Sequence, residues 1–74
     1  MVDADEWRMR VKCILKAELK RRNVTHEELA VRLGAVGVRL APQSISNRIS
    51  RGTFSAVFFV QCLDVIGAAQ VRLD

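Results

Sequence analysis

Apolar residues in the first part of the chain recur every three or four positions, the spacing of one buried stripe on a helix. This stripe comprises Trp7, Val11, Ile14, Leu15 and Leu19. Asp3 and Glu6 have the spacing of a capping box, so the helix is expected to begin near Ala4. Basic residues near its end suit the helix dipole, and Asn23, which tolerates a left-handed backbone, is the expected stop.

A second helix is indicated by Thr25 and Glu28, which repeat the capping-box spacing. Its end is expected at Gly34 or Gly37. Its buried side would carry Leu29, Ala30 and Leu33. These residues predict a shorter helix than the first.

The pattern then changes to strand-like alternation in the letters VRL at residues 38–40, and the same letters return at residues 71–73. The two segments could pair as a short two-stranded β element, within one chain or across a dimer axis. Strands this short are marginal without packing support.

A third helix is predicted over residues 42–50, because Pro42 suits the first position of a helix and Gly52 suits a helix end. Its apolar positions, Ile45 and Ile49, are four residues apart and would face the core.

Thr53 or Ser55 is expected to cap a fourth helix that runs to Gly67. Apolar residues cover nearly its whole circumference, so it should be buried on most sides, partly by a second subunit. Together the four segments predict an all-α fold, a compact four-helix bundle in a single domain over residues 1–74.

The chain is short and basic, with 74 residues and a formal net charge of +4. A basic balance suits nucleic acid or an acidic partner, and it also serves solubility alone. The distribution is more informative than the total, because no acidic residue lies between Glu28 and Asp64. The third predicted helix falls inside this gap.

Several classes of function have little support in the sequence. The lone His26 cannot build a metal site, and there is no glycine-rich phosphate loop or paired-carboxylate cluster. We therefore expect no enzyme activity, no cofactor and no small-molecule ligand. Without a signal peptide or a membrane-spanning run, the expected location is the cytoplasm, with Cys13 and Cys62 as buried, inert thiols.

The stretch PQSISNRISRG, residues 42–52, gives the third helix a distinctive polar side. The side chains away from its two isoleucines are Gln43, Ser44, Asn47, Arg48 and Arg51. Asn and Gln amides pair with adenine in the major groove of DNA, Arg pairs with guanine, and Ser contacts bases or phosphates. An ordinary solvated face is the alternative, although such faces more often mix Lys with Glu.

Basic residues also form a stripe on the first helix, where Arg8, Lys12, Lys16 and Lys20 are four positions apart. We expect this stripe to be a solvated face. The run Lys20, Arg21 and Arg22 lies closer to the second helix and is better placed to meet a phosphate. The aromatic residues have helical spacing, which favours packing over base stacking.

The segment NVTHEELAVRLG, residues 23–34, resembles the first helix of the helix-turn-helix in the lambda-repressor-like family (Cro/repressor, XRE type). ISNRISRGTFS, residues 45–55, resembles the end of the recognition helix in that family, and the likeness covers roughly residues 19–67. The segments NRISRGTF and FFVQCL also look like those of small bacterial proteins of unknown function built on this unit. Gly34 and Ile45 are eleven positions apart, a longer turn than the family pattern has.

The resemblance and the polar third helix together predict a sequence-reading, double-stranded DNA-binding protein, a bacterial transcriptional regulator associated with the nucleoid. Base contacts are expected from Gln43, Ser44, Asn47 and Arg48. Phosphate contacts are expected from Lys20, Arg21, Arg22, Thr25, His26, Arg51 and Thr53. A homodimer is expected, with the fourth helix and the tail as candidate interfaces. The alternatives are a nucleoid-associated DNA-binding protein of low specificity and a protein–protein interaction adaptor on the same scaffold.

Overall fold

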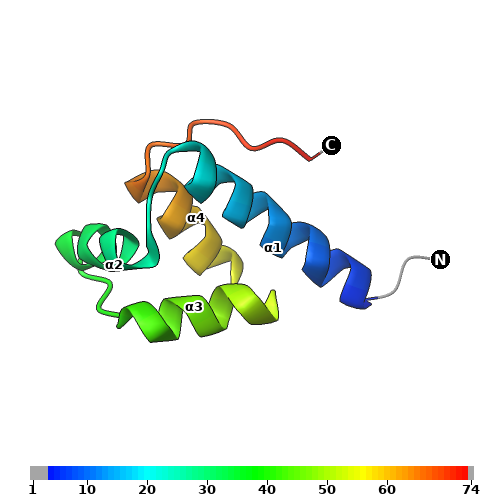
Figure 1. Ribbon diagram of the computed structural model, residues 1–74, viewed down its shortest axis with the longest axis horizontal. Coiled ribbons are helices and arrows are strands. Elements are labelled where there is room, and N and C mark those ends of the chain that lie inside the picture. Colours follow the sequence, from blue (N-terminus) through cyan, green and yellow to red (C-terminus); the bar gives the residue numbers. More distant parts are fainter. Residues whose placement is uncertain (1–3, 74) are drawn as a thin grey trace.

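The computed structural model describes residues 4–73, which form four helices and, within that range, no strand. Along the chain these are α1 (Ala4–Arg21), α2 (His26–Ala35), α3 (Pro42–Arg51) and α4 (Ala56–Val65) (Figure 1). The all-α prediction is confirmed, and each helix lies close to the range that the sequence indicated.

Side-chain capping explains where two of the helices begin. Thr25 Oγ1 accepts a hydrogen bond of 3.1 Å from the backbone N–H of Glu28 at the start of α2. Ser55 Oγ accepts one of 3.1 Å from the N–H of Phe58 at the start of α4, so Ser55 rather than Thr53 is the cap. These bonds satisfy backbone donors that a helix leaves free in its first turn.

Left-handed residues follow all four helices, with Gly67 (φ 79°) following α4. Asn23 follows α1 with φ 58°, confirming the expected stop. Gly37 follows α2 with φ 90° and Gly52 follows α3 with φ 65°. Of the two glycines considered for the end of α2, Gly37 therefore turns the chain, while Gly34 lies within the helix.

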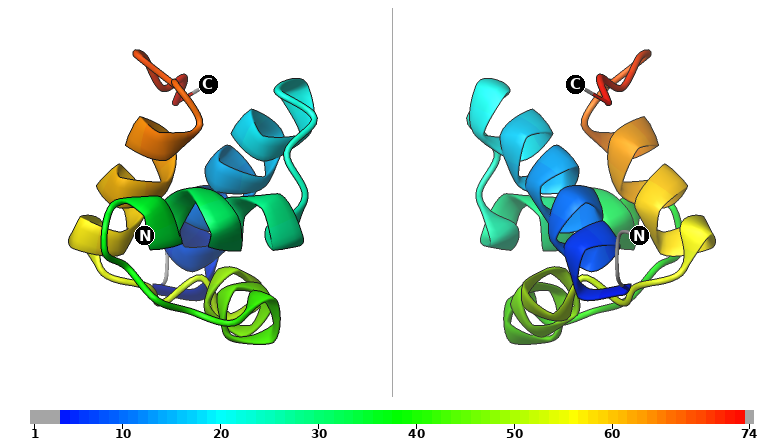
Figure 2. Two further views of the ribbon diagram at one scale, coloured as in Figure 1. Left: turned by 90° about the vertical axis from the view of Figure 1, so that its left-hand side faces the viewer. Right: turned by 90° about the vertical axis from the view of Figure 1, so that its right-hand side faces the viewer.

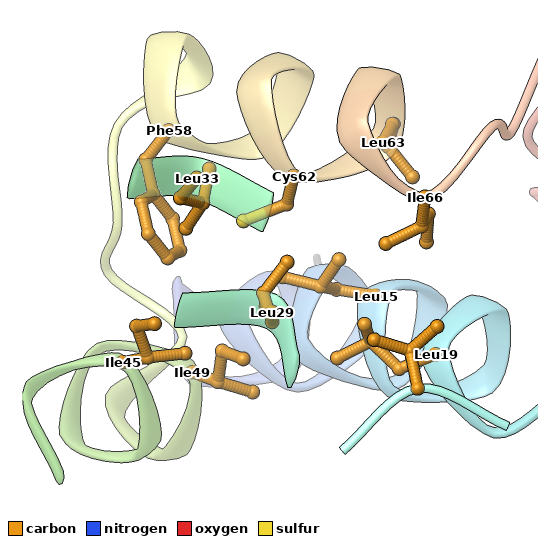
Figure 3. Packing of buried hydrophobic residues seen from close by; sticks show 11 residues of the cluster. Leu15, Leu19, Leu29, Leu33, Ile45, Ile49, Phe58, Cys62, Leu63 and Ile66 are labelled. Atoms are coloured by element: carbon orange, nitrogen blue, oxygen red, sulfur yellow. The ribbon is translucent and has the colours of Figure 1, made fainter. Parts of the chain in front are cut away.

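The helices share one core, in which α1 and α2 each pack against both α3 and α4. Figure 2 shows α1 and α4 side by side, with α2 crossing their ends and α3 beneath. In Figure 3 the side chains of α4 point toward those of α1 and α3, with Leu29 and Leu33 of α2 between them. The buried apolar residues are Leu15, Leu19, Val24, Leu29, Leu33, Ile45, Ile49, Phe58, Cys62, Leu63 and Ile66.

The expected β element is wrong, because residues 38–40 and 71–73 adopt no strand. Val38, Leu40 and Val71 are half-buried and pack against the core, whereas Arg39 is exposed. At residues 38–40 the alternation thus reflects a loop that buries one side on the helices, whereas Leu73 in the second segment is 70% exposed. Burial of this kind needs no partner strand.

Two expectations about burial, those for Trp7 and Cys13, are also wrong, and the burial expected for α4 is found on only part of its surface. Trp7 is 50% exposed, because the first turns of α1 extend past the ends of α3 and α4 (Figure 1). Cys13 lies on the outer side of α1 and is exposed, whereas Cys62 is buried as expected. On α4, Val57 and Val60 are 66% and 61% exposed, so this helix is not covered on most sides by the described chain.

Candidate nucleic-acid interface

The polar side of α3 faces away from the core, as its sequence indicated. Ile45 and Ile49 are completely buried against the other helices. The five side chains singled out in the sequence, Gln43, Ser44, Asn47, Arg48 and Arg51, are all exposed. Because α3 lies at one edge of the molecule, this side is open to a large partner (Figures 1 and 2).

Two of these side chains are joined along the helix. Gln43 Nε2 donates a hydrogen bond of 3.1 Å to Asn47 Oδ1, one helical turn away. The Asn47 amide nitrogen remains available as a donor, and Oδ1 retains a second lone pair. The bond therefore orders both amides without using up their hydrogen-bonding capacity.

Arg48 is held by an aromatic ring. Its guanidinium carbon lies 5.4 Å from the centroid of Phe58, a buried residue in the first turns of α4. A guanidinium over a ring face is attracted by the ring quadrupole, while its N–H groups stay free at the edge. The contact orients Arg48 and links the polar side of α3 to the start of α4.

A second basic feature lies where α1 meets the beginning of α2. Lys16 and Lys20 of α1 line a shallow hollow together with Thr25 and His26. Leu19, Val24 and Glu27 complete its lining. Within residues 4–73 neither lysine has a hydrogen-bonding or ionic partner. We call this feature the α1–α2 corner.

His26 connects the α1–α2 corner to α3. Its Nδ1 lies 2.5 Å from the hydroxyl oxygen of Ser46, a half-buried residue of α3. His26 is itself half-buried, so it is less open than the sequence suggested. Ser46 was not among the predicted site residues. Its position next to the buried Ile45 could have indicated that its side chain lies close to another helix.

The predicted phosphate ligands Arg21 and Arg22 are engaged within the protein. Both bind the carboxylate of Glu18, Arg21 at 2.6 Å and Arg22 through a second hydrogen bond. Glu18 is only 2% exposed and is the one buried charged side chain among the described residues. Its spacing of three and four residues from the arginines could have indicated this pairing. Glu18, Arg21 and Arg22 together carry a net charge of +1.

The basic stripe on α1 is not one solvated face. Arg8 binds Asp5, and Lys12 Nζ donates a hydrogen bond of 3.1 Å to the carbonyl of Ser50 near the end of α3. Only its last two members, which line the α1–α2 corner, are without partners within residues 4–73. Arg8 and Lys12, the first half of the stripe, therefore make contacts within the folded chain.

Arg51, the last residue of α3, and Thr53, two residues further along the chain, are both exposed. The Arg51 guanidinium has no partner in the described range. The predicted phosphate ligands thus fall into two groups, the α1–α2 corner, which meets the middle of α3 through His26 and Ser46, and Arg51 with Thr53 at the C-terminal end of α3.

Other kinds of site are not evident in residues 4–73. No helix there is long and apolar enough to cross a membrane. Nor does that range bring together three His, Cys, Asp or Glu side chains suited to hold a metal ion. Burial raises the pKa of the Cys62 thiol from 9.0 to about 11, which disfavours its reactive thiolate form.

The fold and this surface define a small all-α protein with an amide-rich and basic side on α3. The chain belongs to the family described as Domain of unknown function (DUF6471), which it matches over residues 7–71. No curated protein and no solved structure matches it significantly.

Proposed function

We propose that this protein binds double-stranded DNA and reads its sequence through the exposed side of α3, acting as a bacterial transcriptional regulator in the cytoplasm. In this proposal α2 and α3 form a helix-turn-helix of the lambda-repressor-like kind, with α3 as the recognition helix in the major groove. The observation that carries the proposal is the exposed side of α3, which offers amide, hydroxyl and guanidinium groups and no carboxylate.

Base recognition would come from Gln43, Ser44, Asn47 and Arg48. The Asn47 amide suits adenine and the Arg48 guanidinium suits guanine, and either bidentate pair contributes about 1–3 kcal/mol of discrimination. The Gln43–Asn47 hydrogen bond and the Arg48–Phe58 contact support this role. Side chains that are already ordered lose less conformational freedom on binding.

Phosphates would be bound in the α1–α2 corner and at the C-terminal end of α3. In the corner, Lys16 and Lys20 share a hollow with Thr25, His26 and Glu27 at the beginning of α2, and a helix beginning favours an anion. Arg51 and Thr53 would meet the backbone at the end of α3. This division would hold the helix in register along the groove while the bases are read.

The remaining predicted phosphate ligands would contribute less. Arg21 and Arg22 would add charge at the rim, reduced by their shared partner Glu18. Thr25 uses its hydroxyl to cap α2, so it would contact DNA through its position at the helix start. His26 would offer Nε2, because Nδ1 faces Ser46.

We further propose that the protein acts as a homodimer. A ten-residue recognition helix offers few base contacts, and two copies could read half-sites about one helical turn, roughly 34 Å, apart. The exposed valines of α4, Val57 and Val60, support an interface there. Because α4 carries no basic residue, two chains of charge +4 would meet along it with little repulsion.

Selection of bound fragments from a random duplex library tests the proposal most directly. A DNA-reading dimer enriches a motif with two-fold symmetry. Gel-shift titration of that motif should then show affinity falling by about three to five decades between roughly 50 and 200 mM salt. No enrichment together with no retardation at low salt would refute DNA binding.

Variants test the assignment of contacts. Asn47→Ala and Arg48→Ala should reduce the preference for the selected motif over unrelated duplexes by about tenfold or more. Lys16→Ala and Lys20→Ala should weaken binding to all duplexes alike. Arg10→Ala is a control that removes one charge from a part of α1 outside the corner, where Arg10 donates a hydrogen bond of 3.1 Å to the carbonyl of Leu73. If the α3 variants matched this control, α3 would not be the reading helix.

Two alternatives are distinguished by the same measurements. A nucleoid-associated protein of low specificity would retard every duplex and enrich no motif, and the unpaired lysines of the α1–α2 corner favour this reading. An interaction adaptor would retard none, and the exposed Val57 and Val60 favour a protein partner on α4.

A further inference from the structure

The connection between α2 and α3 carries an arginine whose guanidinium is not held by the part of the chain that the structure describes. Arg39 is exposed, and its guanidinium has no hydrogen-bonding or ionic partner within residues 4–73. The connection spans residues 36–41, longer than the three or four residues usual in a helix-turn-helix. This longer connection is the part of the proposed DNA-binding unit that carries Arg39.

This connection is ordered by its own backbone. The N–H groups of Val36 and Val38 donate hydrogen bonds of 3.1 and 2.9 Å to the carbonyl of Leu33. Gly37 turns the chain with φ 90°. Such contacts limit the number of conformations that the connection can adopt.

The side chains on both sides of Arg39 point inward. Val38 and Leu40 are half-buried and pack against the core, so the residue between them is directed outward by the alternation of an extended chain. The Arg39 backbone is therefore anchored on two sides, while its side chain extends into solvent.

We propose that Arg39 is an additional DNA-binding residue, which contacts a backbone phosphate flanking the major groove that α3 occupies. The inference rests on the proposed function. It extends the contact surface beyond α3 into the long connection between α2 and α3.

Distance favours a phosphate over a base edge. Arg39 precedes Pro42, the first residue of α3, by three positions, and extended residues advance at most about 3.6 Å each. Its Cα therefore lies within about 11 Å of the helix start. Because the major groove is about 12 Å wide, a residue just before the start of a helix in the groove is within reach of the sugar–phosphate wall.

Charge also favours the contact. The connection and α3 contain no acidic residue, so Arg39 would approach DNA without a competing carboxylate on the same segment. A guanidinium binds a phosphate through two parallel hydrogen bonds. An arginine held in place in this way contributes affinity without contributing sequence preference.

The test compares Arg39→Ala, Arg39→Lys and the control Arg10→Ala by salt-dependent titration of the selected duplex and of an unrelated duplex. Arg39→Ala should bind both duplexes about three- to tenfold more weakly at about 100 mM salt, with the slope of log affinity against log salt smaller by about one. Arg39→Lys should keep the slope, because it keeps the charge. Arg10→Ala should behave like the wild type.

The possible results distinguish a failure of this inference from a failure of the proposed function on which it rests. If the wild type binds no DNA, both proposals fail. If the wild type binds and Arg39→Ala has the same affinity and slope, only the contact of Arg39 is refuted. A loss of motif preference with an unchanged slope would also refute it, since that result indicates a base contact. Thermal unfolding should be unchanged in Arg39→Ala, which excludes a folding defect as the cause.

Discussion

Gly52, the residue after α3, lies against the backbone of Arg8 in α1. A Cβ atom on Gly52 would stand 2.7 Å from the Arg8 carbonyl oxygen, closer than two such atoms can approach. Gly52 also has φ 65°, a left-handed conformation that side chains disfavour. One glycine thus ends α3 and allows that end to dock on α1, which sets the direction in which the polar side of α3 faces.

We predict that Gly52→Ala lowers the free energy of unfolding by about 2–4 kcal/mol. This loss has two sources, the left-handed conformation that alanine would have to adopt and the displacement of the Arg8 backbone by the added Cβ. Gly67→Ala is the matched control, because Gly67 has φ 79° and no described atom within 4 Å of an added Cβ. It should cost only about 1–2 kcal/mol. Urea unfolding followed by circular dichroism measures both. Equal losses would show that the contact with Arg8 is unimportant.

The buried carboxylate of Glu18 gives a second prediction. Glu18→Gln keeps the shape of the side chain but removes the charge that holds Arg21 and Arg22, so we expect a loss of about 1–2 kcal/mol in stability. Glu28→Gln is the control, since its pair with Arg32 is at the surface and should contribute less than about 0.5 kcal/mol. A smaller loss for Glu18→Gln than for Glu28→Gln in urea unfolding would contradict the prediction.

The hydrogen bond between His26 and Ser46 should stabilise the packing of α2 on α3. Ser46→Ala is expected to lower the free energy of unfolding by about 1 kcal/mol relative to Ser50→Ala. Both changes replace serine by alanine in α3, so their effects on helix propensity cancel in the comparison. The Ser50 hydroxyl, unlike that of Ser46, has no hydrogen bond within residues 4–73. Identical unfolding midpoints for the two variants would rule the contact out as a stabilising one.

The two thiols should differ in reactivity. At about pH 8 a dithionitrobenzoate reagent should modify Cys13 and leave Cys62 unmodified until the protein unfolds, because Cys62 is inaccessible and its pKa is raised to about 11. Cys13→Ser should then show no rapidly reacting thiol in the native state. Rapid modification of Cys62 in that variant would indicate that the core opens readily.

The same pKa predicts a dependence of stability on pH. Above the ordinary pKa of 9.0 the unfolded chain loses the Cys62 proton, whereas the folded protein keeps it until about 11. The unfolded state then binds fewer protons, so the stability contributed by Cys62 is complete below pH 9 and decreases as the pH rises. Urea unfolding between these values should show this decrease in the wild type and a weaker one in Cys62→Ala.

The proposed dimer can be tested on α4. Wild-type protein should sediment at twice its mass of 8.3 kDa, and Val57→Asp with Val60→Asp should sediment as the monomer. Val31→Asp is the control, because this valine is also exposed, at 73%, but lies on α2. If the wild type remained monomeric at all concentrations, the proposal that α4 forms a dimer interface would be wrong.

Much of the fold follows from local chemistry, which the sequence contains. Thr25 and Ser55 bond to N–H groups three residues ahead, and Asn23 and Gly52 are residue types that tolerate the left-handed backbone angles they adopt. Interactions over so few residues depend little on the rest of the chain. The helix boundaries, the two buried isoleucines of α3 and its exposed polar side could for this reason be predicted.

The sequence by itself therefore determined which segments are helical and which side of α3 is polar. Only the tertiary structure decided whether Lys12 and Lys16 remain available, because the acceptor that binds one of them comes from a distant part of the chain. Lys12 donates to the carbonyl of Ser50, 38 positions away, whereas Lys16, one turn further along α1, meets no such acceptor in the described chain. The same reason explains the loop at residues 38–40, whose alternation is satisfied by packing on a core formed by distant helices.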